Sequence, residues 1–225
     1  TESEIAFVLE NAQHYLSKKP ERSDVLAVFA GLRPLSAPKE EGQKTKEVSR
    51  SHKIIVSETG LITITGGKWT TYRKMAEEIV DKAIVVHSLP QSKCKTENLS
   101  IHGNQFTNDL DRENHLYVYG TDVSGILNLQ ESEPYLQEKL HPDYPYTLAE
   151  VVWAVRNEMA LNLEDILARR IRLLFLDARA STECAEKVCD LMAKELGHNA
   201  TWKENQLTSF TKLANGYLLK EFRIE

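Results

Sequence analysis

The chain has 225 residues, of which 41% are hydrophobic and 27% charged, and its 28 Lys and Arg against 33 Asp and Glu give a net charge of −5. This length suits one large domain or two small ones, and an aromatic content of 8% is typical of a folded protein rather than a disordered one. No stretch approaches the roughly 18 consecutive apolar residues of a membrane-spanning helix, so the sequence predicts no such helix. Residues 1–90 hold 13 basic and 12 acidic side chains, whereas residues 91–225 hold 15 and 21. An acidic C-terminal part would repel a phosphate backbone, so we expect no nucleic-acid partner.

The first 87 residues read as a mixture of helix and strand. Apolar residues from Ile5 to Leu16 repeat at helical spacing and predict a helix that ends before Pro20. The apolar run at residues 25–30 predicts a buried strand. Two β-rich runs, at residues 52–57 and 61–65, flank a tip containing Gly60 and predict a hairpin. A helix is then expected over residues 72–86, with Thr70 or Thr71 as its N-cap.

After a breaker-rich stretch at residues 88–103, the pattern becomes helix after helix. Thr147 and Glu150 form a capping-box pattern, Asn162 can cap a further helix, and Gly197 ends another. Strand patterns are few in residues 104–225, so we predict an all-α C-terminal domain. The expected division is therefore a first domain at residues 1–87, a linker at 88–103 and a helical cap at 104–225.

Cysteine and histidine usage indicates neither disulfides nor a metal site. The three cysteines are odd in number and form no CxxC pair, which favours a reducing, cytoplasmic location. The seven histidines show no HExxH or other metal spacing, so no metal is expected. The dense charges of residues 158–179 are interpreted as ion pairs that link short helices.

The segment with the clearest chemical signal lies between the hairpin and the helix that follows it. Gly66 and Gly67 allow a backbone to approach a ligand closely, and Lys68 adds a full charge next to the positive end of a helix dipole. Such an arrangement can bind an anion or a developing negative charge, although the spacing is not that of a Walker loop. The alternative is a tight strand-to-helix turn with nothing bound. Arg33 and Arg50, near expected strand ends, could add two forks for a phosphate or carboxylate, or be surface ion-pair partners.

Several segments resemble FAD-dependent glycerol-3-phosphate dehydrogenase, in the same order and over nearly the whole chain: residues 29–35 (FAGLRPL), 48–50 (VSR), 60–77 (GLITITGGKWTTYRKMAE), and 150–158 (EVVWAVRNE) through 177–179 (DAR). The resemblance implies oxidation of glycerol 3-phosphate to dihydroxyacetone phosphate, with hydride passing to FAD and electrons to a quinone, or to O₂ in some members. None of the ten glycines forms the GxGxxG turn with which such enzymes begin. We therefore expect a fragment: an α+β end of a flavoprotein FAD/substrate domain, followed by the all-α cap. By itself this fragment is expected to be inactive and to hold no FAD, which would be bound in the full-length enzyme.

The resemblance also implies roles for individual residues. Residues 66–70, which are Gly66, Gly67, Lys68, Trp69 and Thr70, match the segment that meets the pyrimidine edge of the flavin. Arg33 matches a substrate-binding arginine with a catalytic role in holding the phosphate or C2 oxygen, and Arg50 matches a second arginine for the phosphate. Lys68 is the second expected catalytic residue, because its charge would stabilise the reduced flavin.

Other expectations follow from the family rather than from particular residues. Quinone chemistry implies peripheral attachment to the inner face of the cell membrane, and a homodimer is an expected assembly. Two alternatives stay open. The helical part could be a non-enzymatic interaction or oligomerisation domain, or the parent enzyme could be a related FAD oxidase that acts on another substrate.

Overall fold

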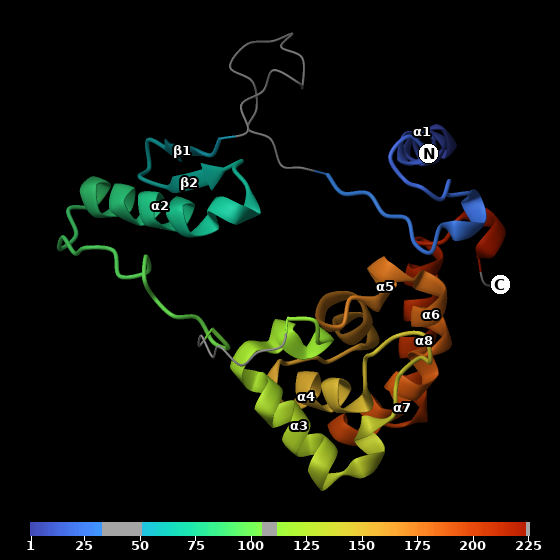
Figure 1. The fold of residues 1–225 in the computed structure, drawn as a ribbon. Helices are drawn as coiled ribbons and strands as arrows, with labels where there is room; N and C mark the ends of the chain where they lie inside the picture. The colour runs from blue at the N-terminus through green and yellow to red at the C-terminus, as the bar shows by residue number, and fades with distance from the viewer. Residues whose placement is uncertain (33–50, 105–111, 224–225) are drawn as a thin grey trace. The chain divides into compact units, whose positions relative to one another are not determined.

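A computed structural model describes residues 1–32, 51–104 and 112–223 of the chain (Figure 1). Contacts divide the chain into two compact units, which are described separately. The helical unit comprises Thr1–Ala30 and Gly103–Glu225, and the hairpin unit comprises Gly31–His102.

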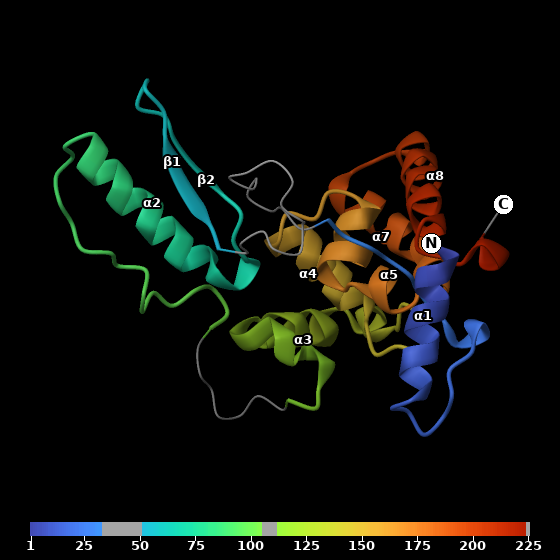
Figure 2. The same cartoon turned by 90° about the horizontal axis from the view of Figure 1, so that it is seen from above.

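The hairpin unit contains the predicted hairpin and the helix after it. Strand β1 (Lys53–Val56) pairs antiparallel with β2 (Ile62–Thr65), with Ile54 opposite Ile64. Helix α2 (Tyr72–Val86) lies along the hairpin and contacts β2 (Figures 1 and 2). Both elements confirm the prediction. The local sequence suffices here, because a β-rich run on each side of a glycine turn specifies a hairpin without help from distant residues.

Capped helices dominate the described part of the helical unit, where the only strand-like pairing is an isolated bridge between Lys139 and Thr147. The all-α prediction for the C-terminal part is thus confirmed for the described residues. The α-helices are α1 (Glu2–Gln13), α3 (Val123–Ser132), α4 (Leu148–Asn157), α5 (Leu173–Leu176), α6 (Ala178–Glu183), α7 (Ala185–Leu196) and α8 (Ala200–Asn215). A π-helical turn, Asp165–Arg170, precedes α5, and short 3₁₀ turns lie at Arg22–Asp24, His115–Asp122, Pro134–Gln137 and Lys220–Phe222.

Helix α4 and helix α7 form the centre of the core. They pack against each other, while α3 contacts α4 and α8 contacts α7 (Figure 1). Val151, Val152, Val188 and Met192 are fully buried between these helices. The capping signals in the sequence mark the helix ends correctly: Thr147 and Glu150 form the capping box of α4, and Gly197 ends α7 in the left-handed conformation at φ 71°.

One element was predicted wrongly. Residues 25–30 are extended but are neither a strand nor buried, since Leu26 is 41% and Phe29 65% exposed. No described strand pairs with them; instead the Val28 N–H donates to the Tyr217 carbonyl (2.8 Å), and the Leu26 carbonyl accepts from the Ala178 N–H (3.1 Å). β-Propensity reflects packing in a sheet, so a run of β-formers without a neighbouring strand does not become one.

These contacts also explain why the first residues group with the helical unit. Arg179 donates to the Val25 carbonyl (3.1 Å), and Arg22 pairs with Glu2 (2.9 Å) and with Glu221 (2.8 Å) near the other end of the chain. The predicted division at residues 1–87, 88–103 and 104–225 concerns the domains of an intact enzyme and stays a prediction. By contacts alone, the chain divides after residue 30 and before residue 103.

Candidate functional site

The candidate site is the turn between β2 and α2, here called the corner and defined as residues 66–70. Gly66 and Gly67 have φ values of 77° and 83°, a region that side-chain-bearing residues rarely adopt. Lys68 is extended, and residues Trp69–Thr71 form a 3₁₀ turn before α2 begins. The structure thus brings Gly66, Gly67, Lys68, Trp69 and Thr70 together, as a continuous segment must. Arg33 and Arg50 lie outside the described residues.

Packing within the hairpin unit accounts for one of the two glycines. A Cβ atom at Gly67 would lie 2.6 Å from the Met75 sulfur and 3.2 Å from the His52 Cβ. Together with its φ of 83°, this close packing explains a glycine at position 67, as the interpretation of a tight turn requires. That interpretation gives no role to the side chain of Lys68, which is exposed and forms no ion pair with any described residue.

The start of α2 is an electropositive helix end. Its N-cap is Thr71, whose hydroxyl donates to the Lys68 carbonyl (3.0 Å) instead of capping an N–H of the first turn, and that turn contains no acidic residue. Arg73 and Lys74 lie there instead, where cations are disfavoured by the helix dipole. Both pair with Glu77, at 2.9 Å and 3.2 Å, and hydrogen bonds from Lys74 and then Arg73 lower the pKa of that carboxyl. Together with Lys68, the helix end can accept an anion or a developing negative charge.

Trp69 extends the corner as an exposed aromatic surface. Its side chain is 85% exposed and stacks on Tyr72 with ring centroids 5.4 Å apart. A large exposed aromatic pair beside a cationic turn suits contact with a planar ligand, since aromatic faces stack favourably.

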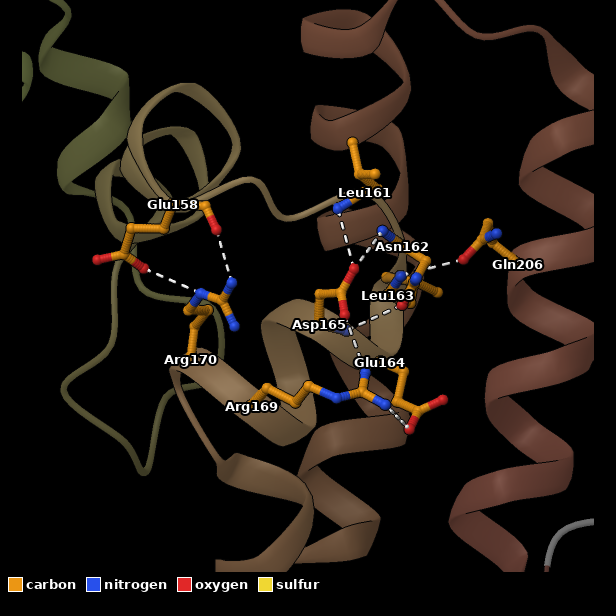
Figure 3. Close-up of polar contacts among 9 residues, drawn as sticks. All are labelled: Glu158, Leu161, Asn162, Leu163, Glu164, Asp165, Arg169, Arg170 and Gln206. Carbon is orange, nitrogen blue, oxygen red and sulfur yellow. Dashed lines mark hydrogen bonds and ion pairs between the residues drawn. The ribbon is translucent and has the colours of Figure 1, made fainter. Parts of the chain in front are cut away.

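The charged stretch of residues 158–179 serves structure, as predicted. Arg169 pairs with Glu164 (2.5 Å) and Asp165 (2.9 Å), and Arg170 pairs with Glu158 (3.2 Å), as Figure 3 shows. The Asn162 side chain accepts from the Asp165 N–H (3.0 Å), which confirms its predicted capping role. The pairs of Arg169 lie within the turn Asp165–Arg170 and its N-cap, whereas the Arg170–Glu158 pair joins this turn to the end of α4. The charges drawn in Figure 3 are thus used in structural ion pairs.

The helical unit also contains a polar network that sequence reasoning identified only as a helix cap. Glu150 is 1% exposed, yet its carboxylate accepts from the Thr147 N–H (2.7 Å), the Tyr119 hydroxyl (3.2 Å) and His115 Nε2 (3.2 Å). Burial first, and then the nearby Glu150 carboxylate, raise the pKa of Tyr119. The network lines a hollow of about 560 Å³, which Arg170 also borders. No pattern could reveal it, because the partners come from separate elements.

Residues 1–32, 51–104 and 112–223 contain neither a metal-binding cluster nor a membrane-spanning helix. No group of three or more His, Cys, Asp or Glu side chains in these ranges could hold a metal ion. None of the helices in the described part is both long and apolar enough to cross a membrane.

The sequence that forms the corner matches a known protein family. Residues 57–206, which include the corner, match a family described as the C-terminal domain of alpha-glycerophosphate oxidase. The chain is 37% identical to a probable mitochondrial glycerol-3-phosphate dehydrogenase of Caenorhabditis elegans over 92% of its length, and 36% identical to the mitochondrial glycerol-3-phosphate dehydrogenase of Mesocricetus auratus over 94%. It spans 31% and 32% of those two proteins, respectively.

The fold has a counterpart among solved structures. The whole chain aligns with 47% of the glycerol-3-phosphate dehydrogenase from Bacillus halodurans, solved in complex with FAD, at a TM-score of 0.75 and 24% identity. That similarity establishes the fold, and the family follows from the sequence match over two thirds of the chain. The chain therefore belongs to the family of the C-terminal domain of alpha-glycerophosphate oxidase.

Proposed function

We propose that this chain is the C-terminal part of a flavoenzyme that oxidises glycerol 3-phosphate to dihydroxyacetone phosphate, with FAD as its cofactor. The observation that carries the proposal is the family match across residues 57–206, because it includes the corner whose charge and shape suit a flavin. The relatives named glycerol-3-phosphate dehydrogenase support the same substrate.

The residues of the corner fit the pyrimidine edge of a flavin. Gly67 carries no side chain at a point where the backbone turns with φ 83°, and Lys68 presents an ammonium group that no described carboxylate neutralises. FAD, when bound, supplies a hydride acceptor. Lys68 and the N–H groups at the start of α2 then hold positive charge against the N1–O2 side of the ring, where negative charge develops. Gly66, Trp69 and Thr70 complete the contact surface.

Substrate binding is assigned to the two arginines outside the described residues. Arg33 is proposed to hold the phosphate or the C2 oxygen during hydride transfer, and Arg50 to bind the phosphate. A guanidinium fork binds a phosphate by two parallel hydrogen bonds, which fixes the orientation of the substrate as well as its position. In the intact enzyme, with FAD bound, Arg33→Ala and Arg50→Ala should therefore raise the KM for glycerol 3-phosphate. An unchanged KM would favour a related oxidase for an unphosphorylated substrate.

The remaining parts of the proposal concern the surroundings of the enzyme. Quinone is proposed as the electron acceptor, with a homodimer attached peripherally to the inner face of the cell membrane on the cytoplasmic side. Cell fractionation tests the location, and recovery with mitochondria, as the names of the two relatives suggest for those proteins, would contradict it. The isolated 225-residue chain is proposed to be inactive. Turnover of glycerol 3-phosphate by this chain with added FAD and a dye acceptor would refute that point.

The role of Lys68 can be tested directly in the intact enzyme with FAD bound. Lys68→Met should slow flavin reduction in a single turnover by about 10²–10³-fold, because loss of one preorganised contact to developing charge costs about that much. Lys82→Met is the matched control, since Lys82 lies exposed on α2 and has no ion-pair partner among the described residues. An equal rate in wild type and Lys68→Met would refute the proposed role.

A further inference from the structure

The side chains of Met75 and His52 bound a narrow slot on the side of Gly67 where a Cβ atom would point. Met75 projects from α2, and His52 directly precedes β1. A Cβ atom at Gly67 would approach the Met75 sulfur to 2.6 Å and the His52 Cβ to 3.2 Å, so Gly67 is in close contact with both. Gly67 therefore packs closely against both side chains, and Lys68 follows it directly in the chain.

A polar contact ties the two sides of this slot together. His52 Nε2 and Glu78 Oε2 are 2.7 Å apart, and the two side chains are 21% and 39% exposed. Glu78 follows Met75 by three residues on α2, so both lie on the same face of the helix. One face of α2 thus supplies Met75, which bounds the slot, and Glu78, which holds His52 on the other side of the slot.

We propose that His52 and Glu78 are positioning residues that fix the corner against the flavin. The inference rests on the function proposed above. Hydrogen bonds from Thr71 to the Lys68 carbonyl and from the Tyr72 N–H to the Trp69 carbonyl shape the turn locally, and the packing of Gly67 against Met75 and His52 attaches it to α2 and to the start of β1. Electrostatic stabilisation requires a donor or charge to be held within about 0.5 Å of its productive position. The contact between His52 and Glu78 sets the width of the slot and therefore acts on the placement of Lys68.

The same hairpin and helix provide an internal control. At the far end of the hairpin, His87 Nε2 lies 3.2 Å from the Gly60 carbonyl oxygen, and a Cβ atom at Gly60 would lie 3.3 Å from His87 Cε1. This contact also joins α2 to a hairpin glycine through a histidine, but it is distant in sequence from the corner. A variant at His87 thus perturbs the attachment of the helix without touching the slot around Gly67.

The test compares variants of the intact enzyme, with FAD bound, by the midpoint potential of the flavin, the single-turnover rate of flavin reduction and the KM for glycerol 3-phosphate. His52→Leu and Glu78→Leu should each make the potential more negative and slow reduction by about tenfold or more, because a misplacement of about 1 Å can cost 10²-fold. The KM should stay within about twofold, since substrate binding is assigned to other residues. The double variant should be no worse than either single variant, because the two residues act as one contact.

Two variants separate positioning from general stability. His52→Gln keeps a side-chain N–H that can donate to Glu78, so it should restore most of the potential and of the rate. His87→Leu should leave both unchanged. If His87→Leu has the same effect as His52→Leu, or if His52→Leu leaves the potential and the rate unaltered in a wild-type background that binds FAD, the positioning role is refuted. An intact wild-type enzyme that binds no FAD would refute the proposed function, and this inference with it.

Discussion

Replacing Glu150 by alanine should destabilise the helical unit strongly. The carboxylate is 1% exposed and accepts four hydrogen bonds: from the Thr147 N–H (2.7 Å) and hydroxyl (3.3 Å), from His115 Nε2 (3.2 Å) and from the Tyr119 hydroxyl (3.2 Å). Glu150→Ala removes the acceptor of all four hydrogen bonds. It also removes one half of the capping box at the start of α4, the helix at the centre of the core.

The magnitude follows from the groups that are left behind. A buried polar group without a partner costs about 1–3 kcal/mol, and loss of a helix cap costs about 1 kcal/mol. The Tyr119 hydroxyl and the Thr147 N–H both lose their partner, but the hollow that Tyr119 lines gives water a route to its hydroxyl. We therefore expect a loss of about 3–4 kcal/mol in the free energy of unfolding. For a chain of this size, this corresponds to a fall in Tm of roughly 6–16 °C.

Denaturant unfolding of the 225-residue chain, followed by far-ultraviolet circular dichroism, measures this loss. Glu150→Gln keeps one carbonyl oxygen as an acceptor and should lose less than Glu150→Ala. Glu204→Ala is the matched control, because Glu204 is exposed on α8 and should change stability by no more than about 0.5 kcal/mol. A loss of less than about 1 kcal/mol in Glu150→Ala would contradict the view that the buried network stabilises the fold.

Three further outcomes are expected. Gly197→Ala should cost about 1–2 kcal/mol through its φ of 71° alone, since no atom lies within 4 Å of the new Cβ, and denaturant unfolding of the helical unit measures it. Gly67→Ala should cost at least as much, because its φ is 83° and the new Cβ would also crowd the His52 Cβ at 3.2 Å, while the flexible end of Met75 can move aside. Faster amide exchange in α2 would report the loss, and a smaller cost than at Gly197 would argue against the close packing. Stability should fall as pH rises above about 9, because burial raises the pKa of Cys184 to about 12, and burial with the hydrogen bond to Asp177 raises that of Tyr144 to about 12. The folded state then keeps protons that the unfolded state loses, and Cys184→Ala should flatten the loss measured by denaturant unfolding between pH 9 and 12.

Much of the candidate site could be predicted, because it is one continuous segment. The positive φ values of Gly66 and Gly67 and the start of a helix just after Lys68 follow from residue types within a few positions. The contacts that hold the segment could not be predicted in this way. His52 and Glu78 are 26 residues apart, and nothing in either local pattern indicates that the helix folds back to place them 2.7 Å from each other.

The sequence by itself determined the hairpin, the helix ends and the family, because turns, caps and motifs depend on interactions between residues that are close along the chain. The capping box at Thr147 and the left-handed helix end at Gly197 are examples. Only the tertiary structure decided that residues 25–30 lie along the helical unit instead of in a sheet, and that the helix-capping Glu150 is also the buried centre of a network. Strand pairing and burial depend on contacts with residues that are distant along the chain, and a local sequence pattern does not identify those residues.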